Sequence, residues 1–367
     1  MKFFDLSKQY SILEKEIDGA VKKVMQDSYF IGGKEVQDFE HDMAQFCNVK
    51  YCAGMNSGTD ALFLALRALN IKEGDEVITT PFTFIATAEV IANCQAKPVF
   101  VDIDPKTFNI DPQKIEEKIT ERTKAIIPVH IFGQMADMDK IVEIANKHKL
   151  FIIEDACQAI GAQYKGKMAG SIGDISAFSF FPTKNLGACA DGGAAITNNS
   201  ELAKKIFLLK NHGSSSEDKY KHLIVGMNSR LDAIQAAILR VKFRYLNEWN
   251  QKRLEIAQYY TKNLSNIKGI ECPQIDDDCV HIFHQYTLKS ERRDELFSFL
   301  KERDIPSMIY YQIPLHLQEA FGYLGYQVGD FPVAESACQS VLSLPIYPEL
   351  SRDDQDLIIK TIKEFFN

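Results

Sequence analysis

Residues 151–162 read FIIEDACQAIGA, and residues 179–187 read SFFPTKNLG. In the first stretch, the apolar run 151–153 predicts a short strand that ends in Glu154 and Asp155. In the second stretch, an expected strand over residues 176–181 leads into a turn that carries Lys184. Polar groups at the ends of buried strands lie where open α/β sheets bind their ligands. The two stretches therefore predict an α/β fold with a functional site at one edge of its sheet.

The sequence around these stretches alternates between strand-like and helix-like segments from about residue 50 to residue 200. Further strands are expected at 76–80, 98–102, 124–129 and 194–197, and helices at 60–69, 83–93 and 141–149. This alternation favours a mostly parallel sheet covered by helices. The pattern changes at the long polar helix expected over 248–264. We therefore expect a large domain over residues 1–247 and a smaller α/β domain over residues 248–367.

Composition and charge exclude several classes of protein. The chain has 367 residues, 46% of them hydrophobic, and a net charge of −8, which argues against nucleic acid or a membrane as partner. Its eight cysteines include no C-x-x-C pair, which argues against a zinc ribbon and is typical of a reducing compartment. No signal peptide and no transmembrane span is expected, and we expect a cytoplasmic protein.

Three sequence elements have a functional interpretation and also a purely structural one. Residues 56–59, NSGT, could bind a phosphate through backbone N–H groups, or could simply cap a helix. Asp155 could bind a cation or cap a helix, and Lys184 could be a desolvated nucleophile or a surface lysine. Together with Phe84, which lies between residues 56–59 and Asp155 in the sequence, these three elements provide the groups that bind pyridoxal 5′-phosphate (PLP). Its phosphate needs N–H donors, its ring needs a stacking face and a carboxylate, and its aldehyde needs a lysine amine.

Six longer motifs carry a family resemblance that runs from about Phe4 to the C-terminus. They are NSGTDAL, PFTFIATAEVI, FIIEDACQAIGA, SFFPTKNLGACADGGA, GMNSRLDAIQAA and PLHLQ, in this order. Together they resemble the DegT/DnrJ/EryC1/StrS family of nucleotide-sugar aminotransferases. The resemblance implies the PLP fold type I of aspartate aminotransferase, and a homodimer with shared active sites.

The resemblance also implies a role for each matching residue. Lys184 forms the Schiff base with PLP and shuttles the proton, and Asp155 pairs with the ring nitrogen. The other cofactor residues are Gln158 at the ring hydroxyl, Phe84 on the ring face, and Gly58, Thr59 and Ser179 at the phosphate. Asn228 reaches the phosphate bound by the partner subunit, and Arg230 and His316 face the sugar.

The expected substrate is a nucleotide-linked keto sugar, with glutamate as amino donor. The segment FPTKNLG followed by DGGA resembles the branch of the family that aminates C3, and Asn185 is the marker of that branch. Arg230 would suit a 3-keto uronate of a UDP-acetamido sugar, and a dTDP-3-keto-6-deoxyhexose is the other candidate. A 4-keto sugar or a keto-cyclitol remains an alternative. A PLP dehydratase is disfavoured because that branch replaces the lysine with histidine. From a different class, the chain could be a non-catalytic PLP-binding regulatory protein.

For several other residues the sequence indicates a role less specifically. His281 and His284 lack further ligands at familiar spacing, so no metal site is expected, and His284 is assigned to the active-site wall or to packing. His130 could make a structural hydrogen bond or lie beside the cofactor. Lys210, with Lys204 and Lys205, is expected on a solvated helix face.

Two features concern the shape of the site itself. Tyr310 and Tyr311 could shape the sugar pocket or pack in the core. Ala190 stands where the family often has glycine, and alanine would be strained there if the backbone required a positive φ.

Overall fold

A seven-stranded sheet forms the centre of the computed structural model, which describes residues 1–215 and 217–367. Its order is β1 (Tyr51–Met55), β9 (Gly193–Thr197), β8 (Ile175–Ser179), β5 (Phe151–Asp155), β4 (Thr123–Ile126), β2 (Glu76–Thr79) and β3 (Lys97–Phe100). Neighbours from β8 through to β3 are parallel, and β9 runs antiparallel to both β8 and β1. The mostly parallel sheet expected from the sequence is confirmed.

Strand direction brings distant parts of the chain to one edge of this sheet. Because β9 is antiparallel to both of its neighbours, β1 runs parallel to β8 and to the strands beyond it. The carboxyl ends of β1, β2, β5 and β8 therefore lie on the same side. Met55 and Ser179 are both paired with Gly193, which fixes the ends of β1 and β8 against the start of β9.

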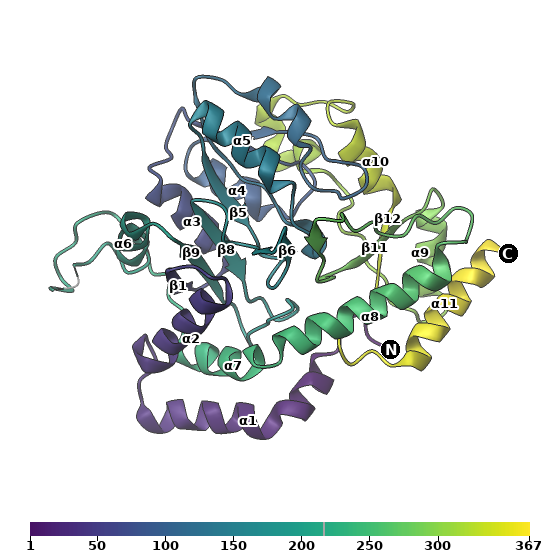
Figure 1. Ribbon diagram of the computed structural model, residues 1–367, viewed down its shortest axis with the longest axis horizontal. Helices are drawn as coiled ribbons and strands as arrows, with labels where there is room; N and C mark the ends of the chain where they lie inside the picture. Colours follow the sequence, from purple (N-terminus) through teal and green to yellow (C-terminus); the bar gives the residue numbers. More distant parts are fainter. Residues whose placement is uncertain (216) are drawn as a thin grey trace.

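Helices cover both faces of the sheet. On one face lie α3 (Gly58–Ala68), α4 (Ala86–Asn93) and α6 (Ser200–Leu209), and on the other lie α2 (Gly33–Phe46), α5 (Met138–His148) and α7 (Ala233–Phe243). Strand alternation separates the two cores, since Ile152 packs in the second and Ile153 in the first. The N-terminal helix α1 (Leu6–Asp27) lies along α7, at the bottom of Figure 1.

The C-terminal part is built around a two-stranded antiparallel sheet of β11 (Tyr286–Lys289) and β12 (Val341–Leu344). The helices α8 (Leu246–Leu264), α9 (Arg293–Lys301) and α11 (Arg352–Phe366) enclose a separate hydrophobic cluster with these strands. Helix α8 crosses the molecule from α7 to α11, and both termini lie at the α11 end (Figure 1). The domain boundary that we propose near residue 247 falls at the start of α8, although Trp249 still packs against α1.

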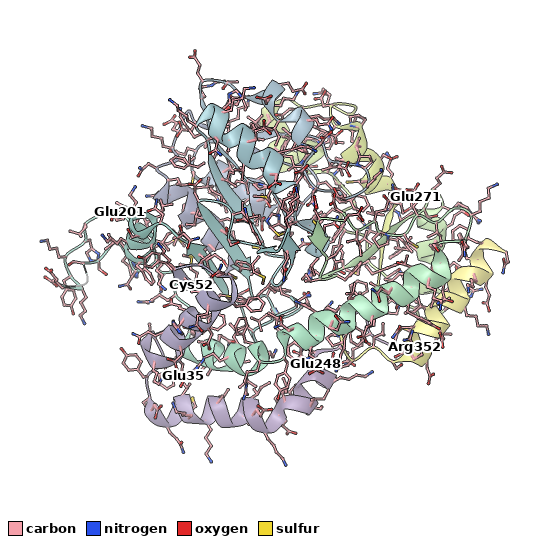
Figure 2. All side chains as sticks on the ribbon, viewed as in Figure 1. Glu35, Cys52, Glu201, Glu248, Glu271 and Arg352 are labelled. Atoms are coloured by element: carbon pink, nitrogen blue, oxygen red, sulfur yellow. The ribbon has the colours of Figure 1, made fainter. Side chains whose placement is uncertain are left out.

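Short elements complete the fold. They are β6 (Gln163–Tyr164), β7 (Lys167–Met168), β10 (Cys279–Val280), α10 (Pro332–Ser340) and the 3-10 turns Pro112–Lys114, Glu116–Lys118, Ile131–Gly133, Leu315–Leu317 and Glu319–Leu324. None of the described helices is both long and apolar enough to cross a bilayer. Figure 2 shows Glu201 of α6 and Arg352 of α11 at opposite ends of the molecule.

Two expectations about local structure were wrong. The helix expected from residue 83 begins at Ala86, because Phe82 and Phe84 belong to the segment that leaves the sheet after β2. Lys210 is not solvated: it is only 8% exposed, and its ammonium group donates to Glu40 Oε1 at 2.9 Å and to the Gly54 carbonyl at 2.8 Å.

Candidate active site

A cavity of about 440 Å³ opens at the edge of the sheet where the parallel strands end. The cavity is lined by residues at or after the ends of β1, β2, β5 and β8, together with residues 284–285 and 310–311. Seven of the residues predicted from the sequence line it: Gly58, Thr59, Phe84, Asp155, Gln158, Ser179 and Lys184. The fold therefore brings together residues that are up to 126 positions apart, from 58 to 184.

The first turn of α3 forms one end of the cavity. Ser57 caps this helix, since its hydroxyl accepts from Asp60 N at 3.0 Å. The amides of Gly58 and Thr59 lie in the first turn, where a helix offers no carbonyl partner, so they are available to an anion. A side chain at position 58 would stand 2.8 Å from Ser179 Cβ, which explains the glycine. This donor set fits a phosphate group.

The carboxylate of Asp155 lies at the end of β5 and is 5% exposed. Its Oδ2 accepts from the Thr87 hydroxyl at 2.7 Å, and its Oδ1 accepts from Cys157 N at 3.2 Å. Two donors keep this buried carboxylate oriented toward the cavity that it lines. An anion held in this way is suited to pair with a cationic ring nitrogen.

A buried pair of side chains, His130 and Glu154, lies beside the end of β5. His130 Nε2 lies 2.9 Å from Glu154 Oε2, and both side chains are fully buried. His130 Nδ1 accepts from Ala136 N at 3.2 Å, so Nε2 carries the proton. Although burial favours the neutral acid, hydrogen bonds from His130 and from nearby amides, Gly173 among them, hold the pKa of Glu154 below its ordinary value. His130 does not line the cavity, and its hydrogen bonds to Glu154 and Ala136 favour the structural interpretation.

The amine of Lys184 lies in the cavity wall, beyond the end of β8. A turn presents it, in which Lys184 N donates to the Phe181 carbonyl at 2.8 Å. Burial lowers the pKa of Lys184 below its ordinary value, while the negative charge of Asp155 acts in the opposite direction. A lysine with a lowered pKa is a better nucleophile toward a carbonyl at neutral pH. Ala190 is not among the residues with positive φ, so the backbone strain considered for it is absent.

Aromatic and polar side chains form another part of the cavity wall. Gln158 Oε1 accepts from Phe132 N at 2.9 Å, and its Nε2 donates to the Tyr311 hydroxyl at 3.2 Å. Burial raises the pKa of Tyr311, so its hydroxyl stays protonated and can donate into the cavity. Tyr310 also lines the cavity, so both tyrosines shape the pocket. Phe84 is 57% exposed and can offer a ring face to a bound cofactor.

Four predicted residues do not line the cavity of their own chain: Asn185, Asn228, Arg230 and His316. Asn185 is 4% exposed and bonded to neighbouring polar groups, and Asn228 lies exposed on the surface. Arg230 donates to Asn211 Oδ1 at 3.1 Å, and its Nε has no partner among residues 1–215 and 217–367. The direct sugar contact expected for His316 finds no support, because His316 is 2% exposed and is held by Glu335 at 3.1 Å and by Phe331.

Sequence reasoning also missed residues that line the cavity, notably Thr87, Cys157, Thr183 and Asp191. Thr87 gave a usable signal, because it is a polar residue between two alanines, Ala86 and Ala88, at the start of an expected helix. No group of three or more potential metal ligands occurs in the described part of the chain.

The comparisons with known proteins agree with this geometry. A model of the DegT/DnrJ/EryC1/StrS aminotransferase family matches residues 11–363. A pleiotropic regulatory protein of Geobacillus stearothermophilus is 51% identical over 364 residues, covering 99% of this chain and 97% of the relative. The dTDP-3-amino-3,6-dideoxy-alpha-D-galactopyranose transaminase of Aneurinibacillus thermoaerophilus is 45% identical over 363 residues, covering 99% of each.

Among solved structures, S. venezuelae DesV, determined in complex with a ketimine intermediate, is 41% identical. It superimposes with a TM-score of 0.97 and covers 100% of this chain and 98% of that chain. The fold, the cavity and these relatives lead to one conclusion: the chain belongs to the DegT/DnrJ/EryC1/StrS family of PLP-dependent aminotransferases.

Proposed function

We propose that this chain transfers an amino group from glutamate to the C3 keto carbon of a nucleotide-linked sugar, with PLP bound in the cavity. The observation that carries the proposal is the convergence of Lys184, Asp155 and the free amides of Gly58 and Thr59 at one edge of the sheet. These groups supply an amine, a carboxylate and an anion cradle, which are the three functions that PLP requires. Amination at C3 is further supported by the 45% identical relative, a 3-amino sugar transaminase.

Each side chain has a defined task in this proposal. PLP supplies an electron sink that makes the carbon-bound hydrogen of the amino donor acidic. The Asp155 carboxylate keeps a proton on the ring nitrogen, since an opposite charge favours the protonated form. The Lys184 amine would carry a proton from the α-carbon of the amino donor to the cofactor and, in the second half of the exchange, from the cofactor to the sugar carbon that gains the amine. The amides of Gly58 and Thr59, with the Ser179 hydroxyl, bind the phosphate, and Phe84 covers the ring.

The proposed assembly is a homodimer with shared active sites. Large apolar side chains remain exposed on the single chain, including Phe84 and Phe181 at the cavity and Tyr29, Phe30 and Ile31 before α2. Exposed apolar groups around a cavity are typical of a surface that another subunit covers. The exposed position of Asn228 is compatible with a contact to the phosphate in the partner's cavity.

A regulatory protein without catalytic turnover is the second candidate, and the name of the 51% identical relative favours it. Against it stands the full set of groups that transamination needs, including a buried carboxylate and a lysine with a lowered pKa. A binding protein has no need of a proton-transfer amine beside that carboxylate.

One experiment separates the two candidates. The purified protein with PLP is incubated with glutamate and a panel of 3-keto and 4-keto nucleotide sugars on dTDP and UDP, and products are detected by mass spectrometry. We expect one 3-keto substrate to gain an amine, located at C3 by NMR, and 2-oxoglutarate to form in equal amount. The Lys184→Ala variant is the control without turnover. Amination at C4 alone would contradict the proposed amination at C3. If no amino donor changes the absorbance spectrum of bound PLP, the regulatory candidate would be favoured.

A further inference from the structure

A chain of buried polar groups connects the loop after β5 with the cavity wall. Asn250 Nδ2 donates to the Ile160 carbonyl at 3.0 Å. Asn185 Nδ2 donates to Asn250 Oδ1 at 2.8 Å and to the Ile282 carbonyl at 3.2 Å. Asn185 Oδ1 then lies 3.2 Å from His284 Nδ1. Asn250, Asn185 and His284 are each no more than 9% exposed, so water does not replace these bonds.

The two backbone carbonyls fix the direction of every bond in this chain. A carbonyl can only accept, so the Asn250 group facing Ile160 is its NH2 group, and its oxygen faces Asn185. Asn185 must then place its own NH2 group between that oxygen and the Ile282 carbonyl. The Asn185 oxygen is left facing the imidazole of His284. Because an amide oxygen only accepts, His284 Nδ1 carries a proton and donates it.

The remaining nitrogen of His284 is consequently a hydrogen-bond acceptor. In a neutral imidazole with Nδ1 protonated, Nε2 bears the lone pair. Burial, together with the positive charges of Lys184 and Arg253, lowers the pKa of His284 well below its ordinary value, so the ring stays neutral. Nε2 has no hydrogen bond within residues 1–215 and 217–367 and is not among the fully enclosed polar atoms. His284 lines the cavity, so this lone pair is open to it.

We propose that His284 Nε2 is a specificity-determining acceptor for a sugar hydroxyl on the carbon next to the keto carbon, and that Asn185 is a positioning residue that fixes the tautomer of His284. The inference rests on the proposed function, since it assumes a keto sugar in the cavity beside Lys184. A neutral acceptor selects for a donor and against an oxygen that can only accept. A site built around such a bond discriminates against an analogue that lacks the hydroxyl, because Nε2 is then left unpaired. This gives Asn185 an effect on the sugar without a direct contact.

A substrate pair tests the role of His284. The rates of amination of a dTDP-linked 3-keto sugar with a C4 hydroxyl and of its 4-deoxy analogue are compared as kcat/KM. We expect the wild-type protein to prefer the hydroxylated substrate by about tenfold, the value of one hydrogen bond. The preference should disappear in His284→Phe and in Asn185→Leu. His281→Phe is the matched control, because His281 is equally buried, stacks on Phe283 and lies outside the cavity lining. It should retain the preference.

A second measurement does not depend on turnover. In protein labelled with 15N-histidine, the His284 signal is identified by its loss in His284→Phe, and its couplings report which nitrogen carries the proton. We expect Nδ1–H in the wild-type protein and a shift toward Nε2–H in Asn185→Leu. An Nε2–H tautomer in the wild-type protein, or the same hydroxyl preference in wild-type and His284→Phe protein, would overturn the inference. If no keto sugar reacts with the wild-type protein, the proposed function fails, whereas the NMR result still decides the tautomer.

Discussion

The Thr87 hydroxyl donates to Asp155 Oδ2 over 2.7 Å and thereby joins the first turn of α4 to the end of β5. Because Thr87 uses its proton in this bond, the neighbouring Thr83 hydroxyl, 3.2 Å away, must donate to Thr87. Thr87 therefore orients the carboxylate directly, and Thr83 in turn orients the Thr87 hydroxyl. This arrangement predicts how catalysis responds to changes at position 87.

Replacing Thr87 by valine should lower kcat, because valine has the same shape but cannot donate to Asp155. A hydrogen bond to a charged group contributes about 1.5–3 kcal/mol, so we expect kcat to fall by roughly 10- to 100-fold. Thr87→Ser keeps the hydroxyl and should stay close to the wild-type rate. Asp155→Asn should be more damaging than Thr87→Val, since it removes the charge itself. Steady-state kinetics of the three variants test this order, and a Thr87→Val enzyme with the wild-type kcat would refute the role of this bond.

Lys184 should be the residue that reacts with PLP. Borohydride reduction of the PLP-bound protein, followed by peptide mapping, should place the label on Lys184 in the segment FPTKNLG. Since burial lowers its pKa, a larger fraction of its amine is unprotonated at a given pH than for an ordinary lysine of pKa 10.5. In the cofactor-free protein, acylation of Lys184 should therefore be half-maximal below pH 10.5. Exposed Lys22 is the internal reference for acylation. Label on any lysine other than Lys184 after reduction would contradict the assignment.

The sequence predicted the parts of the site that depend on local pattern. Apolar runs placed Asp155 at the end of one strand and Lys184 beyond the end of another, and parallel strands carry such ends to one edge. The fold class followed from the same alternation. Helix and strand limits shifted by a few residues where the chain leaves the sheet, as before Ala86, because tertiary packing and not local pattern decides those positions.

The sequence could not predict which residues act through others. Asn185 follows the lysine directly, yet its side chain turns away from the cavity to Asn250 and His284, which lie 65 and 99 positions along the chain. Lys210 resembled a surface lysine because its partner, Glu40, is 170 residues away. Partners at such separations leave no periodic signal in the sequence, so contacts of this kind appear only in the structure.

The ion pair of Lys210 and Glu40 should contribute strongly to stability. Both side chains are largely buried, and Glu40 Oε1 also accepts from Gly54 N at 2.7 Å, next to the end of β1. Removing one partner leaves a buried charge, which costs about 3–5 kcal/mol. Lys210→Met should therefore lower the free energy of unfolding by about this amount in urea titrations. Lys204→Met, whose exposed pair with Glu201 is worth about 0–1 kcal/mol, is the matched control. Equal stability of both variants would show that the buried pair is not needed.

Arg230 should affect substrate binding if the substrate carries a carboxylate. Among the described residues its guanidinium makes one hydrogen bond, from Nη1 to Asn211 Oδ1, so further N–H groups of the Nη atoms are left to donate to an anion. For a 3-keto uronate substrate, Arg230→Ala should raise KM by roughly 10-fold or more, as expected for a lost charged hydrogen bond. For a neutral 3-keto-6-deoxy sugar, KM should change little. Rates that do not distinguish the two substrates, and do not change in Arg230→Ala, would contradict a carboxylate contact.

A mixed dimer tests whether the active sites are shared between subunits. Lys184→Ala and Asn228→Ala should each be impaired alone, the first through the missing amine and the second through the phosphate contact. If Asn228 acts in the cavity of the partner subunit, a dimer of the two variants has one site with both wild-type residues and one site with neither. Random assembly makes about half of the dimers mixed, so co-expression should restore roughly a quarter of the wild-type activity. Separate expression followed by brief mixing, without time for subunit exchange, is the control. Activity in the co-expressed sample no higher than in the Asn228→Ala homodimer would show that Asn228 acts within its own chain or not at all.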